Sequence, residues 1–176
     1  MERFLSPVAR FLVGSAAVVA GSWVLANTAM YRQAEAWSTA KIVDVTVGQG
    51  THLQDGTATV FVGLQTGHGV GLHIDNLCST SGVAGLMLII TGLLVLVAGL
   101  RFRRAFLGLG AMIGLVTAVN VLRLTVLSWS VARWGLFGWF EWLHLYGGAA
   151  ISMLAIAAGC GLFVLVVRRT PAQVPA

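Results

Sequence analysis

Residues 105–132, AFLGLGAMIGLVTAVNVLRLTVLSWSVA, decide the fold class, because this long apolar run carries a single charged side chain, Arg123. The hydrocarbon core of a bilayer is about 30 Å thick and takes about 20 helical residues to cross. Residues 11–30, 80–100 and 145–167 form three further runs of this kind. A chain that is 57% hydrophobic and 10% charged does not suit a soluble globule. The sequence therefore predicts an all-α polytopic membrane protein, a four-transmembrane-helix bundle in which residues 1–176 form one domain.

The basic residues predict how the bundle is oriented. Most of them would flank the apolar runs on one side: Arg3, Arg10, Arg101, Arg103, Arg104, Arg168 and Arg169. Since cytoplasmic flanks are rich in Lys and Arg, we expect both termini to be cytoplasmic in a multi-pass protein of the cell (plasma) membrane. The pI near 10.3 then reflects topology, and we expect no nucleic-acid partner. The first run exceeds the usual core of a signal peptide, so we expect a retained helix, with a cleaved signal peptide as the alternative.

Residues 31–79 have a different pattern and are expected to lie outside the cell as a β-rich insertion between the first two membrane helices. Residues 42–47 and 57–62 are rich in β-branched side chains, and residues 70–74 alternate between apolar and other residues. Glycine-containing turns separate these stretches. We therefore predict a small antiparallel sheet or hairpin of about three strands, whose last strand runs almost directly into Cys78.

Three chemically capable side chains are predicted to meet at the outer end of the bundle. Cys78 lies 23 residues before Arg101 and His144 lies 24 residues before Arg168, which is roughly 35 Å of helix in each case. Arg123 lies slightly deeper, but its long side chain can reach the same level. A charge within a membrane span is costly and indicates function by default. A thiol, a guanidinium and an imidazole at one level suit covalent acyl transfer.

Neighbouring residues are expected to support this site. The start of a helix would lower the pKa of the Cys78 thiol, with Ser79, Thr80 or Ser81 as the cap. Asn120 lies one turn before Arg123 and could bond to it or to a substrate carbonyl; its alternative role is helix packing.

Glu141 precedes His144 by three residues and could orient the imidazole. Cys160 lies inside an apolar run and is expected to be a small buried hydrophobe. No C-x-x-C spacing exists, and we expect neither a metal nor another cofactor.

The sequence resembles the exosortase and archaeosortase family of membrane-embedded sorting enzymes. The resemblance covers about residues 75–150 and rests on Cys78-Ser79-Thr80-Ser81-Gly82, Asn120-Val121-Leu122-Arg123 and His144-Leu145-Tyr146-Gly147-Gly148. The family's Cys is typically followed more closely by Gly, and many members have about eight spans, so this chain would be a compact member.

The resemblance implies a cysteine protease or transpeptidase with Cys78 as nucleophile and Arg123 and His144 as its partners. It also implies substrate proteins that end in a short motif, a transmembrane helix and a basic tail. The substrate motif, the choice between hydrolysis and transfer, and the oligomeric state are not fixed by the sequence.

Several other functions are compatible with the same residues. A non-catalytic four-helix scaffold or complex subunit would use the 22 glycines for close packing and Arg123 for a partner's carboxylate. A thiol oxidoreductase would need a second cysteine near Cys78, and Cys160 would lie about 24 Å deeper than His144. A rhomboid-like serine protease would use Ser81 but would lack a partner histidine deep in the bundle. A channel would require more polar groups within the membrane than Arg123 and Asn120.

Overall fold

The computed structural model describes residues 7–168 apart from residues 49, 55, 67–68 and 137–138. The described chain is mostly helical and includes a small three-stranded sheet. Three helical segments are long and apolar enough to cross a membrane: α1 (Pro7–Ala26), α4 (Phe102–Trp134) and the continuous segment Trp139–Arg168. The last segment consists of α5 (Trp139–Trp142), the π-helical turn η2 (Leu143–Gly147) and α6 (Gly148–Arg168). The prediction of an apolar, helical membrane protein is therefore supported.

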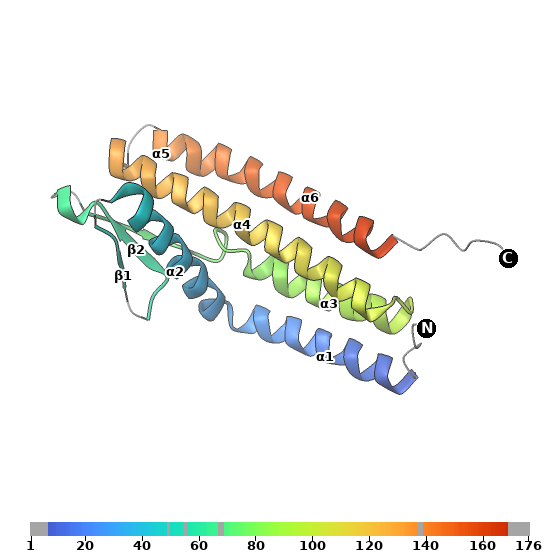
Figure 1. The fold of residues 1–176 in the computed structure, drawn as a ribbon. Coiled ribbons are helices and arrows are strands. Elements are labelled where there is room, and N and C mark those ends of the chain that lie inside the picture. The colour runs from blue at the N-terminus through green and yellow to red at the C-terminus, as the bar shows by residue number, and fades with distance from the viewer. Residues whose placement is uncertain (1–6, 49, 55, 67–68, 137–138, 169–176) are drawn as a thin grey trace.

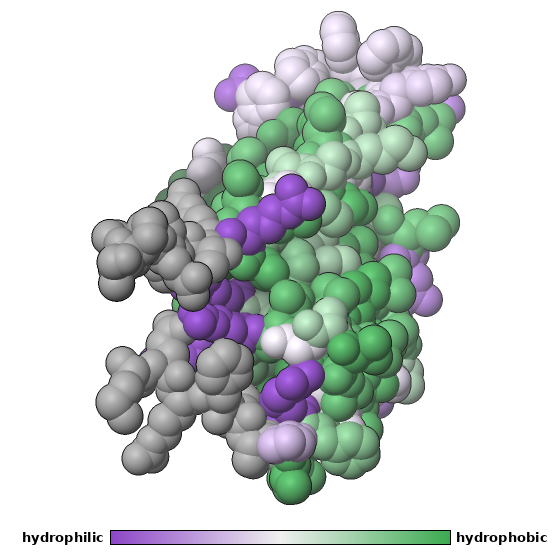
Figure 2. All heavy atoms as spheres, turned by 90° about the vertical axis from the view of Figure 1, so that its right-hand side faces the viewer, coloured by the Kyte–Doolittle hydropathy of each residue, from purple (hydrophilic) through white to green (hydrophobic). Residues whose placement is uncertain are grey.

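The predicted crossing at residues 80–100 corresponds to α3 (Ser81–Val97), an apolar helix of 17 residues. It is shorter than the three membrane-length segments, so the predicted count of four crossings is not established by helix length. The helices pack lengthwise, with the sheet at one end and the start of α1 and the end of α6 at the other (Figure 1). Viewed from that second end, hydrophilic residues interrupt a largely hydrophobic surface (Figure 2). The arginines that flank the helices at this end are Arg10, Arg101, Arg103, Arg104 and Arg168.

Glycines set the close approach of α1 to α3. A Cβ on Gly21 would lie 2.6 Å from the carbonyl oxygen of Gly85, and a Cβ on Gly92 would lie 2.7 Å from that of Gly14. On α1, Gly14 and Gly21 are seven residues apart, and on α3 Gly85 and Gly92 have the same spacing. Seven residues are about two helical turns, so the two glycines of each helix lie on one face. Small residues at this spacing let two backbones pack directly, which is how membrane helices associate without a hydrophobic driving force.

Residues 28–47 form one helix, α2 (Thr28–Val47), which follows α1 after a break at Asn27. The prediction of a strand at residues 42–47 is therefore wrong. The buried positions of α2 are spaced by three, four and seven residues, which is the helical period: Glu35, Ala36, Thr39, Ala40 and Val43. Ala36, Ala40 and Val43 pack in an apolar cluster with the sheet and α4. This burial outweighs the preference of β-branched residues for strands.

The other two predicted strands are present as β2 (Thr59–Val62) and β3 (Val70–His73). The third strand is β1 (His52–Leu53), and the sheet is antiparallel with the order β1-β2-β3. Val60 and Val62 are almost fully buried against α2 and α4. The short 3-10 turn η1 (Leu64–Thr66) lies between β2 and β3. The sheet therefore packs on the end of the helical bundle, and β3 leads into the segment that carries Cys78.

Candidate functional site

Cys78 lies in a turn that ends just before α3. One carboxylate oxygen of Asp75 accepts hydrogen bonds from the backbone N–H groups of Leu77, at 2.9 Å, and Cys78, at 2.8 Å. An aspartate that bonds to backbone groups two or three residues further on stabilises a tight turn. Thr80 occupies the N-cap position of α3, but its side chain makes no capping bond to the helix. The position of Cys78 is therefore set by Asp75.

A buried network fixes the other side of this turn. The side-chain amide of Asn120, on α4, donates to the carbonyl oxygen of Cys78 at 2.9 Å and to the carboxylate of Glu35 at 3.0 Å. The same oxygen of Glu35 accepts bonds from the N–H and hydroxyl of Thr80, at 3.1 and 2.6 Å. Glu35 is only 2% exposed. Asn120 thus holds the backbone of Cys78 and links α4 to α2, which is its predicted alternative role in helix packing; a bond to Arg123 is not among its contacts in the described chain.

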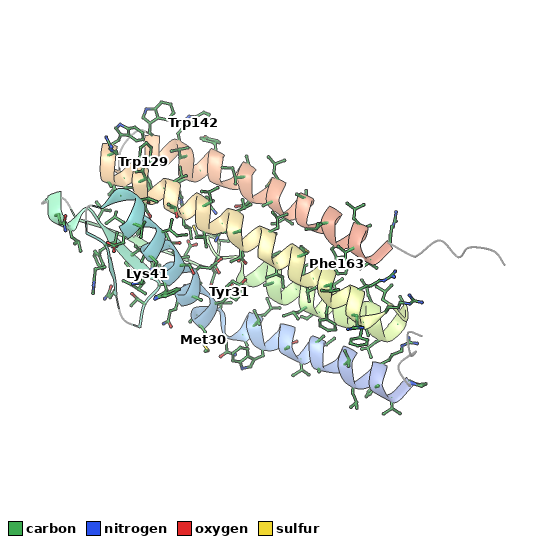
Figure 3. All side chains as sticks on the ribbon, viewed as in Figure 1. Met30, Tyr31, Lys41, Trp129, Trp142 and Phe163 are labelled. Atoms are coloured by element: carbon green, nitrogen blue, oxygen red, sulfur yellow. The ribbon has the colours of Figure 1, made fainter. Side chains whose placement is uncertain are left out.

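Tyr31 extends this network from the start of α2, the position shown in Figure 3. Its hydroxyl lies 2.9 Å from that of Thr117 on α4 and 3.5 Å from that of Thr80. Polar groups that are buried and mutually bonded specify one arrangement of their helices, because a mismatched packing leaves them unpaired. The network therefore holds α2 against α4, which carries Arg123, and against the turn before α3, which carries Cys78.

Arg123 reaches Cys78 from α4, as the sequence predicted. Its Nη2 lies 4.0 Å from the sulfur of Cys78, and its Nη1 donates to the hydroxyl of Ser152 on α6 at 3.3 Å. A Cβ on Gly148 would lie 2.5 Å from Nε of Arg123, so the guanidinium occupies the space that a side chain would fill. Nε itself is buried and has no hydrogen-bond partner among the described residues. The second glycine of Gly147-Gly148 is therefore required by the placement of Arg123.

His144 lies in η2, where the helix widens into a π-turn. Such turns are rare and occur frequently at functional sites. The imidazole stacks on Phe140, with centroids 5.6 Å apart and planes 9° apart. Its Nδ1 is buried without a hydrogen-bond partner among the described residues, while Glu141 is exposed on α5. Phe140, rather than the predicted Glu141, packs against the ring.

Cys78 lines two cavities. The larger, about 270 Å³, lies between the sheet and the ends of the helices, and His144 is in its wall. The smaller, about 100 Å³, lies between α3, α4 and α6, and its wall includes Asn120, Arg123 and Ser152. The structure therefore brings Arg123 to the sulfur of Cys78 and places His144 in the wall of the other cavity that Cys78 lines.

Two charged residues near Cys78 shift the pKa of its thiol in opposite directions. Burial raises the pKa of the Cys78 thiol, the Asp75 carboxylate raises it further through charge and a hydrogen bond, and Arg123 lowers it without cancelling the rise. Burial acts to raise the pKa of Asp75 as well, but the bonds from Cys78 and Leu77, together with the charge of His144, leave it lowered. The expectation that the helix start lowers the pKa of this thiol is therefore not met, because burial and the Asp75 carboxylate together outweigh Arg123.

Asp75 and Glu35 are the residues that sequence reasoning missed. The spacing Asp75-Asn76-Leu77-Cys78 is a turn signal that could have identified Asp75. Glu35 had no such signal, because it was assigned to a β-rich segment rather than to a buried helix. Cys160, by contrast, packs against the apolar cluster of α4 and α6, although it is partly buried rather than buried as predicted. In the described part of the chain, no group of three His, Cys, Asp or Glu side chains is placed to hold a metal ion.

Comparisons with known proteins do not assign this chain to a family. No protein-family model, curated protein or solved structure matches it. The function must therefore be argued from the geometry around Cys78.

Proposed function

We propose that this chain is a membrane-embedded cysteine protease or transpeptidase with Cys78 as its nucleophile. The observation that carries the proposal is the 4.0 Å separation between the Cys78 sulfur and Nη2 of Arg123, at a sulfur that also lines a cavity with His144. Arg123 is half-buried within a 33-residue apolar helix, and an intramembrane charge of this kind is retained at a cost. Acyl transfer uses such a cation to stabilise the oxyanion that develops on the attacked carbonyl.

The proposed reaction begins with the protonated thiol that burial and Asp75 favour. The thiol transfers its proton to His144, and the sulfur attacks the substrate carbonyl while Arg123 stabilises the oxyanion. His144 then protonates the leaving amine, and water or another nucleophile releases the acyl-enzyme. The Asp75 carboxylate opposes loss of the thiol proton but stabilises the imidazolium that accepts it. One carboxylate thus favours both the protonated thiol and the protonated imidazole.

The proposed substrates and topology follow from the family resemblance and the basic residues. Substrates are proteins with a C-terminal motif, a transmembrane helix and a basic tail, as in exosortases and archaeosortases. The bundle crosses the cell membrane four times, with α3 as the fourth crossing, both termini cytoplasmic and the sheet outside. The 17 residues of α3 are at the lower limit of a spanning helix. Arg10 donates hydrogen bonds, at 3.5 Å each, to the carbonyl oxygens of Val95 and Leu96 in the last turn of α3.

The proposal is tested in host cells that carry wild-type protein, Cys78→Ala or Cys160→Ala. We expect Cys78→Ala alone to cause uncleaved envelope proteins with C-terminal helices and basic tails to accumulate, as measured by mass spectrometry of the membrane fraction. Cys160→Ala is the matched control, because it removes the chain's other thiol from an apolar cluster. Unchanged processing in the Cys78→Ala strain, at equal protein level, would contradict the proposal and favour a scaffold.

A further inference from the structure

The outer edge of β3 has unpaired backbone groups. The backbone N–H of Ile74 donates to the carbonyl of Ala58 at 2.8 Å, which makes this an inter-strand hydrogen-bonded pair. Such pairs alternate along an antiparallel ladder, so Leu72 and Val70 also bond to β2. The N–H and C=O groups of Gly71 and His73 must then point away from β2. Within the described chain β3 is an edge strand with no partner on that side.

This edge borders the larger cavity that contains the thiol. Gly71, Leu72 and His73 form one wall of the 270 Å³ space, and Cys78 and His144 are also in its lining. The volume is close to the lower limit of ligand pockets, about 300 Å³, and suits a short segment rather than a folded partner. Most of the other lining residues are apolar.

Two polar atoms of residues in this wall lack a partner among the described residues, Nδ1 of His144 and the hydroxyl of Thr39. Thr39 is 1% exposed, lines the cavity from α2, and its hydroxyl makes no hydrogen bond among the described residues. A buried hydroxyl without a partner costs free energy that a ligand's polar group would recover. The cavity therefore combines an open strand edge, an unsatisfied hydroxyl and a nucleophile.

We infer that the substrate binds as an added β-strand on the edge of β3, paired to the backbone of Gly71 and His73, with an apolar side chain in the cavity beside Cys78. Extended peptides bind sheet edges in this way, with main-chain hydrogen bonds for affinity and a pocket for selectivity. The occupant is an extended segment of the substrate protein, next to the bond that is cleaved. This inference rests on the proposed function, since it places the attacked carbonyl at the sulfur.

The test uses full-length protein in lipid nanodiscs, in a Cys160→Ala background so that Cys78 is the only thiol. The probes are iodoacetamide and a set of acetyl-tripeptide chloromethyl ketones ending in Ala, Val, Leu or Thr. We expect at least one peptide probe to alkylate Cys78 much faster than iodoacetamide. N-methylation of that probe's backbone should remove most of the advantage. If no peptide probe gains an advantage, or if N-methylation has no effect, strand addition is wrong.

Two substitutions of His73 separate the contribution of its backbone N–H to probe binding from that of its side chain. His73→Pro removes the outward N–H and leaves the ladder to β2 intact, since proline is tolerated at a strand edge in this orientation. His73→Ala loses the same side chain and its bond to Thr59 but keeps the N–H. We expect the peptide probe to react about tenfold more slowly with His73→Pro than with His73→Ala, while iodoacetamide reacts equally fast with the two variants. Equal rates of the peptide probe with the two variants would overturn the inference.

Strand addition and the proposed function can be refuted separately. Loss of the peptide-probe advantage with intact, Cys78-dependent processing in cells would refute strand addition alone. Normal processing in Cys78→Ala cells would refute the proposed function, whatever the probe rates.

Discussion

Replacing Gly148 with alanine should push the Arg123 guanidinium away from Cys78. The new Cβ would lie 2.5 Å from Nε, 2.8 Å from Nη2 and 2.9 Å from Cζ, and real Cβ contacts are essentially never below 3.0 Å. A retreat of about 1 Å would lengthen the 4.0 Å separation between Nη2 and the sulfur to about 5 Å. At an effective dielectric constant of about 20, the attraction between guanidinium and thiolate falls from about 4 to about 3.3 kcal/mol.

That loss of about 0.8 kcal/mol corresponds to about fourfold less thiolate at neutral pH. The assay is the rate of Cys78 alkylation by iodoacetamide, measured across pH in the Cys160→Ala background. Gly147→Ala is the control, because its Cβ would meet only Leu143, at an ordinary 3.6 Å. We expect a shift to higher pH in Gly148→Ala and none in Gly147→Ala.

Two results would refute this reasoning, provided that thermal unfolding shows both variants to be folded. An unchanged alkylation rate in Gly148→Ala would mean that Arg123 does not act on the thiol. Equal slowing in both variants would mean that the effect comes from the helix backbone around η2 and not from the guanidinium.

Three further predictions concern charge, the buried network and helix packing. The pKa of Cys78, measured as the midpoint of its alkylation rate against pH, should lie above that of an ordinary cysteine in the wild type; Asp75→Asn should move it to lower pH and Arg123→Gln to higher pH. Because the pKa of Asp75 is lowered on folding, its contribution to stability is present above about pH 4 and is lost as the pH falls through the folded value. The gap in stability between wild type and Asp75→Asn should therefore close in acid. Glu35→Ala should destabilise the protein by about 3 kcal/mol or more in denaturant unfolding, since it leaves three donors from Thr80 and Asn120 without their acceptor. Gly85→Ala should cost about 1–3 kcal/mol because its Cβ would lie 2.7 Å from Leu25, whereas Gly82→Ala, which meets open space, should not destabilise.

The sequence predicted the level of Cys78, Arg123 and His144 because helix rise is constant. Counting residues from the flanking arginines requires only that each run be helical. The contact between Arg123 and Cys78 confirms that this count was sufficient for two of the three residues. His144 lines a cavity with Cys78, but the count could not give its π-turn or its stacking on Phe140, which depend on packing at the end of the bundle.

The segment between α1 and β2 was mispredicted for a physical reason. Ile42, Val43, Val45 and Val47 have the composition of a strand, but burial follows the helical spacing of Ala36, Ala40 and Val43. Composition indicates only the local preference of residues for strand or helix. Which face of α2 is buried depends on where α4 and the sheet lie, and the sequence of this segment does not show that. Glu35 was missed for the same reason, since its three donors come from α3 and α4.

Asp75 is the residue that decides between a catalytic and a merely structural Cys78. If the turn existed only to start α3, its carboxylate would need to accept only the two backbone N–H groups. Its charge also raises the pKa of the thiol, and the charge of His144 lowers the pKa of Asp75, which a capping role does not require. In the proposed reaction both interactions are used in order, the first before proton transfer and the second after it. Asp75→Asn keeps an oxygen acceptor for the backbone and removes the charge, so it should make the thiol more reactive toward iodoacetamide while slowing substrate cleavage. A structural role predicts that the two activities change together, and that outcome would remove Asp75 from the mechanism.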